Sequence, residues 1–247
     1  MDTRPNDLGQ PIGPPLPDWQ PPPPPPRTSM HGTRVCVEPL APERHADDLW
    51  SACREDTDER LWTYLPYGPF ADRAAYDATM SAGWLGDEPL FHAIVDRATD
   101  RARGVAAYLR IFPAVGSIEV GHVCFAPRLQ GTTAATEAMY LMMRRAFELG
   151  YRRYEWKCDA LNAASNAAAR RFGFTYEGTF RQAVVYKGRS RDTNWYSIVD
   201  GEWPALDAAY RRWLDPGNFD AGGRQRTRLA ALIDAALGRA PREDCPT

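Results

Sequence analysis

The sequence of 247 residues has no long hydrophobic run and little net charge, and both absences narrow its function. No apolar run approaches the roughly 18 residues of a membrane span, and no basic and then apolar leader is visible. The formal net charge is -2 and the isoelectric point is about 6.1, so the chain has no general attraction to phosphate backbones. We therefore expect a cytoplasmic protein that binds neither membranes nor nucleic acid.

Paired cysteines and the common nucleotide-binding glycine motifs are also missing. The five cysteines are an odd number without the paired spacing of a zinc site: Cys36, Cys53, Cys124, Cys158 and Cys245. We expect reduced thiols and no metal, with Cys124 and Cys158 buried and inert on core strands. Neither a P-loop nor Gly-x-Gly-x-x-Gly is present, so a nucleotide site of either kind is not expected.

Proline is concentrated in residues 1–29 and runs without interruption from Pro21 to Pro26. Such a stretch forms neither a helix nor an inner strand, so we predict an extended polyproline-II arm. It is either a docking peptide for an aromatic groove, or a spacer or strap on its own domain that Trp19 anchors. After it we expect one domain over residues 30–214 and a helical C-terminal extension over residues 215–247.

Apolar periodicity predicts the elements of this domain. Three-and-four spacing of apolar residues predicts helices at 42–55, 72–85, 134–150, 163–172, 203–214 and 224–237. Branched and alternating residues predict strands at 33–37, 90–96, 102–111, 117–125, 153–159, 174–177, 182–187 and 193–199. The order predicts an α/β fold, with a mixed sheet that has helices on both faces.

The loop from Arg128 to Thr133 lies between the strand that ends at Phe125 and a predicted helix. Gly131 allows the backbone to approach a ligand closely, and the first N–H groups of a helix have no partner within the helix. This order of strand, turn and helix predicts an anion site that suits a pyrophosphate.

Two groups of motifs resemble the GNAT acetyltransferases. Arg128 and Gly131 match the Arg/Gln-x-x-Gly-x-Gly/Ala loop of that family, whereas Thr133 stands where the family prefers glycine or alanine. Further along, the chain is similar to the ribosomal-protein N-terminal acetyltransferases in Asn162-x-x-Ser165-Asn166, Gly173-Phe174-x-x-Glu177-Gly178 and Arg181-Gln182-Ala183. The resemblance extends from about Arg34 to Leu214.

The resemblance implies a fold and a cosubstrate. The GNAT fold has a twisted, mostly antiparallel sheet with a splayed central parallel pair of strands, and the pantetheine of acetyl-CoA enters this gap. The implied cofactor-binding residues are Phe125, Arg128, Leu129, Gln130, Gly131, Thr132, Thr133, Ala134 and Asn162. In the aromatic segment 61–70, Trp62, Tyr64 and Tyr67 are either substrate contacts or packing residues between helices and sheet.

Glu119 is the candidate to accept the proton of the reacting amine, directly or through water. The alternative is a structural carboxylate that bonds a neighbouring strand or a substrate cation. His122 lies on the opposite face of a regular strand, but a bulge at Gly121 would redirect it. We consider His122 either a second catalytic group or a structural residue.

The resemblance also identifies a candidate acid for the departing thiolate. Many members have a tyrosine at the position of Ala169, whereas the ribosomal-protein branch has a serine that Ser165 matches. Some members of that branch pair the serine with a glutamate, which is Val184 here. Ser165 is therefore the expected proton donor. The tyrosine of other members and the glutamate partner of the serine are both missing here.

The acceptor follows in part from amine chemistry. A polypeptide α-amine with a pKa near ~7.8 is more than about a tenth neutral at pH 7. The pKa of a lysine, near ~10.4, lies about 3.4 units above that pH, so a lysine is much harder to deprotonate. We expect N-acetyl transfer to a protein or peptide α-amine by direct attack. The alternatives are a small amine, such as a polyamine, amino acid or antibiotic, and a non-catalytic acyl-CoA-binding module. A homodimer is also possible.

Overall fold

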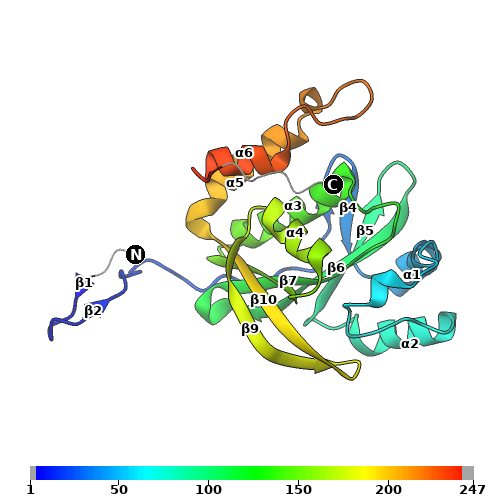
Figure 1. Ribbon diagram of the computed structural model, residues 1–247, viewed down its shortest axis with the longest axis horizontal. Coiled ribbons are helices and arrows are strands. Elements are labelled where there is room, and N and C mark those ends of the chain that lie inside the picture. The colour runs from blue at the N-terminus through cyan, green and yellow to red at the C-terminus, as the bar shows by residue number, and fades with distance from the viewer. Residues whose placement is uncertain (1–3, 241–247) are drawn as a thin grey trace.

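The computed structural model describes residues 4–240, and an eight-stranded sheet forms its centre (Figure 1). The strands are β3 (Met30–His31), β4 (Val35–Pro39), β5 (Leu90–Asp96), β6 (Arg101–Phe112), β7 (Ser117–Phe125), β8 (Arg153–Asp159), β9 (Thr175–Tyr186) and β10 (Arg189–Val199). Their order in the sheet is β3-β4-β5-β6-β7-β8-β10-β9. Neighbours are antiparallel except for the parallel pair β7 and β8, which confirms the predicted mixed sheet.

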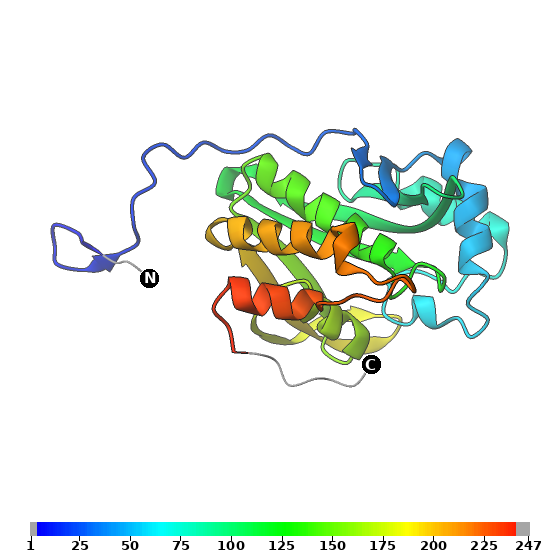
Figure 2. The same ribbon diagram turned by 90° about the horizontal axis from the view of Figure 1, so that it is seen from above.

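Helices cover both faces of the sheet, as predicted (Figures 1 and 2). One face carries α3 (Thr133–Glu148), α4 (Ala163–Arg171), α5 (Trp203–Leu214) and α6 (Leu229–Ala236) over the larger core. The other face carries α1 (Pro42–Cys53) and α2 (Arg73–Gly83) over a smaller core at β5, β6 and β7. We call this second face the α1 face. Short 3-10 turns lie at η1 (Arg60–Trp62), η2 (Pro113–Val115), η3 (Asp200–Glu202) and η4 (Pro216–Asn218).

Side-chain caps fix where three of the helices begin. Asp72 accepts a hydrogen bond from the N–H of Ala75 at the start of α2, and Thr132 does the same for Ala135 at the start of α3. Asn162 caps α4 in this way. Because such caps satisfy N–H groups that have no partner within the helix, the two predicted turns that precede α3 and α4 are held at defined positions.

Several strand predictions were wrong in their bounds, and the last strand, β10, begins at Arg189 rather than residue 193 because Arg189, Ser190 and Arg191 pair with β9. The first strand starts at Val35 rather than residue 33, because the buried carboxylate of Glu137 on α3 accepts the N–H groups of Thr33, Arg34 and Val35. The predicted strands 174–177 and 182–187 form a single strand, β9. β9 stays paired with β10 through register shifts, which accommodate the residues at which the sequence pattern indicated a break.

The last predicted helix was too long. Residues 224–228 are not helical, and α6 begins at Leu229, after an isolated antiparallel bridge between Phe219 and Gln225. Leu229 and Ile233 belong to the main core, so this C-terminal helix packs on α5 and the domain.

The proline-rich arm packs partly on its own domain. Pro22 and Pro25 are buried while the prolines around them are exposed, as expected when a helix with three residues per turn lays one side on a surface. Trp19 lies under the guanidinium of Arg152 at 6.0 Å, and Arg27 donates to Asp87 at 3.0 Å. The segment from Trp19 onward runs along the domain, whereas β1 (Arg4–Pro5) and β2 (Pro11–Ile12) form a separate hairpin (Figure 2).

The described residues are also relevant to the predictions about membrane spans and cysteines. None of the helices between residues 4 and 240 has the length and apolar content that crossing a membrane requires. Cys36, Cys53, Cys124 and Cys158 are free thiols, and Cys245 lies outside the described residues. Cys124 and Cys158 are buried on β7 and β8, as predicted, and burial raises the pKa of Cys158.

Candidate active site

The central parallel strands β7 and β8 diverge at the point where their pairing ends. Pairing between β7 and β8 runs from Ser117 opposite Arg153 to Val120 opposite Trp156, and it ends there. Beyond that point β7 stays paired to β6, and β8 stays paired to β10 as far as Asp159. The facing edges of the two strands therefore open into a gap, into which an extended ligand can insert as an added strand.

A bulge at His122 turns its side chain towards the α1 face. Gly121 is opposite Ala107 and Cys124 is opposite Val105, so β7 has one residue more than β6 at this point, and His122 has a φ of 49°. The bulge that would redirect this side chain is therefore present. The imidazole stacks on Tyr67 with centroids 5.7 Å apart, and its Nδ1 lies 3.3 Å from the Tyr67 hydroxyl. Burial lowers the pKa of His122 to about 4, so the ring is neutral at pH 7.

Glu119 lies on the same face, at the point where the strands begin to diverge. Its carboxylate is 2.5 Å from Nζ of Lys157 and 3.4 Å from Nε of Arg110, and the residue is only 5% exposed. Arg110 reaches it from a second bulge, on β6, where φ is 47°. Burial raises the pKa of Glu119, whereas the charge and hydrogen bond of Lys157 lower it, and the net direction is upward.

Further ion pairs continue from Glu119 across β8. Nζ of Lys157 is 3.4 Å from Glu155, and Arg153 bonds both Glu155 at 2.7 Å and Glu177 at 2.5 Å. The indole of Trp195 lies beneath Lys157, with 3.7 Å from Nζ to the ring centroid. With Arg110 and Glu119, this ion-pair row holds three carboxylates and three cations, so its formal charge is balanced.

The loop before α3 has the free donors that an anion needs. Within residues 4–240, the N–H groups of Gly131, Thr133 and Ala134 donate to no protein acceptor. Gly131 has a φ of 70°, and nothing lies within 4 Å of the position that a Cβ would take. These donors lie at the N-terminus of a 16-residue helix, where the helix dipole also favours negative charge.

Three predicted side chains of this loop are otherwise engaged. Leu129 is buried in the main core, so only its backbone could contact a ligand. Gln130 donates from Nε2 to the carbonyl of Phe125 at 2.8 Å, on the edge of the gap. Arg128 is mostly exposed and pairs with Glu55 at 3.2 Å.

The start of α4 brings the predicted acid next to the gap. Oδ1 of Asn162 accepts the N–H of Ser165 at 3.0 Å, so this side chain caps the helix. The hydroxyl of Ser165 accepts a hydrogen bond from Nε1 of Trp156 at 3.0 Å. A serine hydroxyl is also a donor, and here it additionally lies within hydrogen-bond reach of the Cys158 thiol. Ala169 is fully buried and has no role in proton transfer.

Asn166 is a structural residue that the sequence reasoning missed. Its Nδ2 donates to the carbonyls of Asp159, Ala160 and Asn162, and its Oδ1 accepts from Asn194 and Tyr196. It thereby ties the end of β8, the start of α4 and β10 together. The signal in the sequence was the second asparagine of the Asn-x-x-Ser-Asn motif.

Some residues of the aromatic segment 61–70 pack in the smaller core, and others lie at the candidate site. Trp62 is 5% exposed and belongs to the smaller core, which favours packing, while Tyr67 contacts His122. Tyr64 donates to the carbonyl of Leu161 at 3.1 Å, across the end of the gap. From the tip of the β9–β10 hairpin, side chains also bond this segment: Lys187 to the Trp62 carbonyl at 2.6 Å and Arg189 to the Thr63 carbonyl at 3.0 Å.

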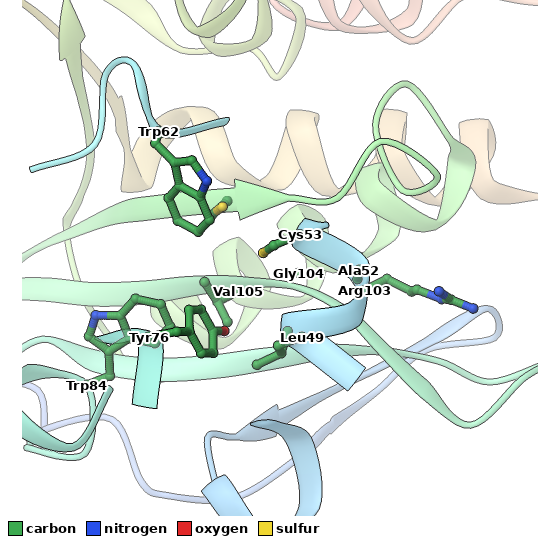
Figure 3. A pocket seen from close by; sticks show the side chains of 10 residues that line it. Leu49, Ala52, Cys53, Trp62, Tyr76, Trp84, Arg103, Gly104 and Val105 are labelled. Carbon is green, nitrogen blue, oxygen red and sulfur yellow. The ribbon is translucent and has the colours of Figure 1, made fainter. Parts of the chain in front are cut away.

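Figure 3 shows a hollow between α1, the aromatic residues and β6. Its lining includes Leu49 and Cys53 from α1, Tyr76 from α2 and Val105 from β6. Its volume is about 10 Å³, which is close to the minimum for one water molecule. This hollow is therefore too small to hold an acceptor.

The arrangement combines a gap for an extended ligand with groups that can accept and donate protons. Between residues 4 and 240, no three His, Cys, Asp or Glu side chains gather as a metal site would require. The gap and the loop suit an extended ligand with an anionic end. A buried carboxylate and a neutral imidazole on one side, and a serine hydroxyl on the other, can accept and donate protons.

Comparisons with known proteins agree with this geometry. The family model "Acetyltransferase (GNAT) domain" matches residues 34–175. A GCN5-related N-acetyltransferase from Brucella melitensis is 44% identical, with a TM-score of 0.86, over 89% of this chain and 100% of that one. A probable acetyltransferase of the GNAT family from Chromobacterium violaceum ATCC 12472 is 42% identical, with a TM-score of 0.74, over 79% and 98%.

A more distant likeness concerns a protein of stated acceptor. RimL, a ribosomal alpha-N-protein acetyltransferase, is 21% identical with a TM-score of 0.57, over 69% of this chain and 93% of that one. At this identity the likeness shows the fold alone. No curated protein matches the chain.

Proposed function

The chain belongs to the GNAT family of acetyltransferases, and we propose that it transfers an acetyl group from acetyl-CoA to the α-amine of a polypeptide N-terminus. Acetyl transfer is the activity of the family, and the polypeptide acceptor is the proposal. The observation that carries it is the ion-pair row beside the gap, where Glu119, Glu155 and Glu177 are matched by three cations.

The charge balance disfavours polycationic acceptors. A pocket for a polyamine or an aminoglycoside needs an excess of carboxylates, because several ammonium groups must be paired when they leave water. Here each carboxylate of the row already has a cation, and Lys187 and Arg189 add positive charge at the hairpin tip. A single α-amine near its own pKa enters such a site at lower cost. The fold that the chain shares with RimL is consistent with this acceptor.

The residues present fit acetyl-CoA, which supplies the thioester when it is bound. The N–H groups of Gly131, Thr133 and Ala134 would hold its pyrophosphate, with Arg128 at the rim, whereas those of Leu129, Gln130 and Thr132 already donate to the carbonyls of Ala126 and Leu129. Backbone groups of Phe125 and the amide of Asn162 would bind the pantetheine along the gap. Gln130 would then release the Phe125 carbonyl.

Each proton in the transfer has a place in this chain. As the amine nitrogen forms its bond to the acetyl carbon, Glu119 accepts the amine proton, because burial raises the pKa of this carboxyl and makes it a stronger base. His122 stays neutral and positions the acceptor with Tyr67. As the carbon–sulfur bond breaks, Ser165 passes its hydroxyl proton to the departing thiolate and takes a proton from a water molecule in its place.

The test is an acceptor panel with acetyl-CoA, in which free thiol is followed and products are identified by mass. Peptides that begin with Ser, Ala or Thr are compared with polyamines, amino acids and aminoglycosides. We expect turnover with peptides, and acetylation at the α-amine only. Turnover confined to the small amines would contradict the proposal, and tight acetyl-CoA binding without any turnover would favour a non-catalytic module.

A further inference from the structure

Three buried polar atoms on one strand lack a hydrogen-bond partner. They are Nε of Arg191, Oγ1 of Thr193 and Nε1 of Trp195, and none of them bonds any group in residues 4–240. Alternate residues of a strand point to the same side, so these three share one face of β10. Asn194 and Tyr196, which alternate with Thr193 and Trp195, point the other way, since both donate to Asn166 on α4. We call Arg191, Thr193 and Trp195 the β10 strip.

A buried polar atom without a partner is costly. Leaving one unsatisfied costs roughly 1–3 kcal/mol, and native proteins carry few of them. Three at successive same-side positions of one strand are therefore hard to explain as packing faults. Arg191 and Trp195 can only donate, and Thr193 can donate, so the missing partner offers acceptor atoms.

The β10 strip lies beside the predicted point of reaction. In the sheet, Trp195 is opposite Lys157 and Thr193 is opposite Asp159, on the strand that forms one wall of the gap. Through Lys157, Trp195 adjoins Glu119, which is the candidate base. Arg191 stands at the far end, towards the hairpin tip.

The spacing of the strip fits an extended polypeptide. Same-side positions on a strand repeat about every 6.6 Å, and so do the same-side carbonyls of an extended peptide laid alongside it. A peptide whose amine lies at Glu119 would thus place successive carbonyl oxygens at Trp195, Thr193 and Arg191. Near the hairpin-tip end of the strip, the Trp62–Tyr64 segment bonds Lys187, Arg189 and Leu161. An acceptor would displace this segment in order to reach the strip.

We propose that the β10 strip binds the main-chain carbonyls of the acceptor polypeptide and so selects peptides over small amines. This proposal rests on the proposed function and extends it to named residues. It makes the strip a binding site for the acceptor, separate from the residues that hold the cosubstrate.

The test uses Trp195→Phe, which removes the N–H but keeps a ring beneath Lys157, and Thr193→Val, which removes the hydroxyl at nearly the same volume. Each is assayed in the full-length protein with serinamide and with the tetrapeptide Ser-Ala-Ala-Ala. We expect the wild-type protein to have the lower KM for the tetrapeptide. Each variant should raise that KM about three- to tenfold more than the KM for serinamide, while the KM for acetyl-CoA stays within about twofold.

Thermal unfolding without peptide separates a ligand site from a structural one. Since the hydroxyl that Thr193→Val removes has no protein partner, that variant should melt at the wild-type temperature or above it, whereas Trp195→Phe also loses ring contacts with Phe180 and Arg110 and should melt lower. The control is Trp213→Phe, which removes an indole N–H that does have a partner, Gln225 at 2.7 Å on the other side of the sheet. This control should melt lower and keep the peptide preference.

The possible outcomes assign failure to one proposal or the other. A wild-type preference for the tetrapeptide that both variants retain overturns the strip and leaves the proposed function standing. A Thr193→Val variant that melts well below the wild type shows that the hydroxyl serves the fold through an internal water, which also overturns the strip. A wild-type protein that acetylates neither serinamide nor the tetrapeptide overturns the proposed function, and the strip with it.

Discussion

Glu137 should be among the most costly residues to change outside the site. Its carboxylate is 4% exposed and accepts the N–H groups of Thr33, Arg34 and Val35 at 2.9, 2.6 and 3.0 Å. A Cβ at Gly32 would come within 2.6 Å of this carboxylate, so the turn before β4 is shaped around it. These bonds attach β4 to α3, the helix whose N-terminus forms the anion site.

The change Glu137→Gln keeps the size of the side chain but replaces one acceptor oxygen by an NH₂ group. Oε2 accepts two of the three backbone N–H groups, so the amide oxygen would take its place; the NH₂ group then faces the N–H of Thr33, which leaves two buried donors without an acceptor, and the other two bonds lose the negative charge. A hydrogen bond to a charged group contributes about 1.5–3 kcal/mol, so the loss should be about 3–5 kcal/mol. For a chain of this length, this corresponds to a fall in Tm of about 10 °C.

The assay is urea unfolding at pH 7, with thermal unfolding as a second measurement. Glu148→Gln is the matched control, because it makes the same change at the exposed end of the same helix, where the carboxylate pairs with Arg144 at 3.5 Å. The control should change the free energy of unfolding by less than about 0.5 kcal/mol. A loss below about 1 kcal/mol for Glu137→Gln would refute the reasoning that these three bonds hold the turn.

Two further predictions concern the site, and a third concerns the pH dependence of fold stability. Ser165→Ala should lower kcat with little change in the KM for acetyl-CoA, and an unchanged kcat in steady-state assays would remove this residue from proton transfer. Lys157→Met should destabilise the fold by about 3–5 kcal/mol, since it leaves Glu119 and Glu155 without the cation between them. It should also move the acid limb of the kcat/KM profile to higher pH, because Lys157 lowers the pKa of Glu119; an unmoved limb would exclude Glu119 as the titrating base. Burial lowers the pKa of His92 from 6.5 to about 4, so its neutral form stabilises the fold above pH 6.5, and about 3 kcal/mol should be lost as the pH falls towards 4. Unfolding measured from pH 7 to pH 4 should show this slope, and His92→Gln should lack most of it.

Much of the fold could be predicted because its signals are local. The bounds of β5, β7, β8 and α5 follow directly from apolar periodicity and turn residues. Prediction failed where a distant residue set the boundary, as Glu137 does for β4, or where a bulge carried a strand through an apparent break, as in β9. Neither effect has a local pattern.

The sequence by itself determined the family, the order of strand, loop and helix, and the candidate residues, because these depend on residue type and spacing along the chain. Only the tertiary structure decided which candidates meet. The bulge at His122 brings it to the face of Glu119, and the register of β8 against β7 sets Lys157 beside that carboxylate. The unpaired atoms of the β10 strip likewise become visible only when every neighbour is in place. The physical reason is that strand register and side-chain burial are set by partners far away in the sequence.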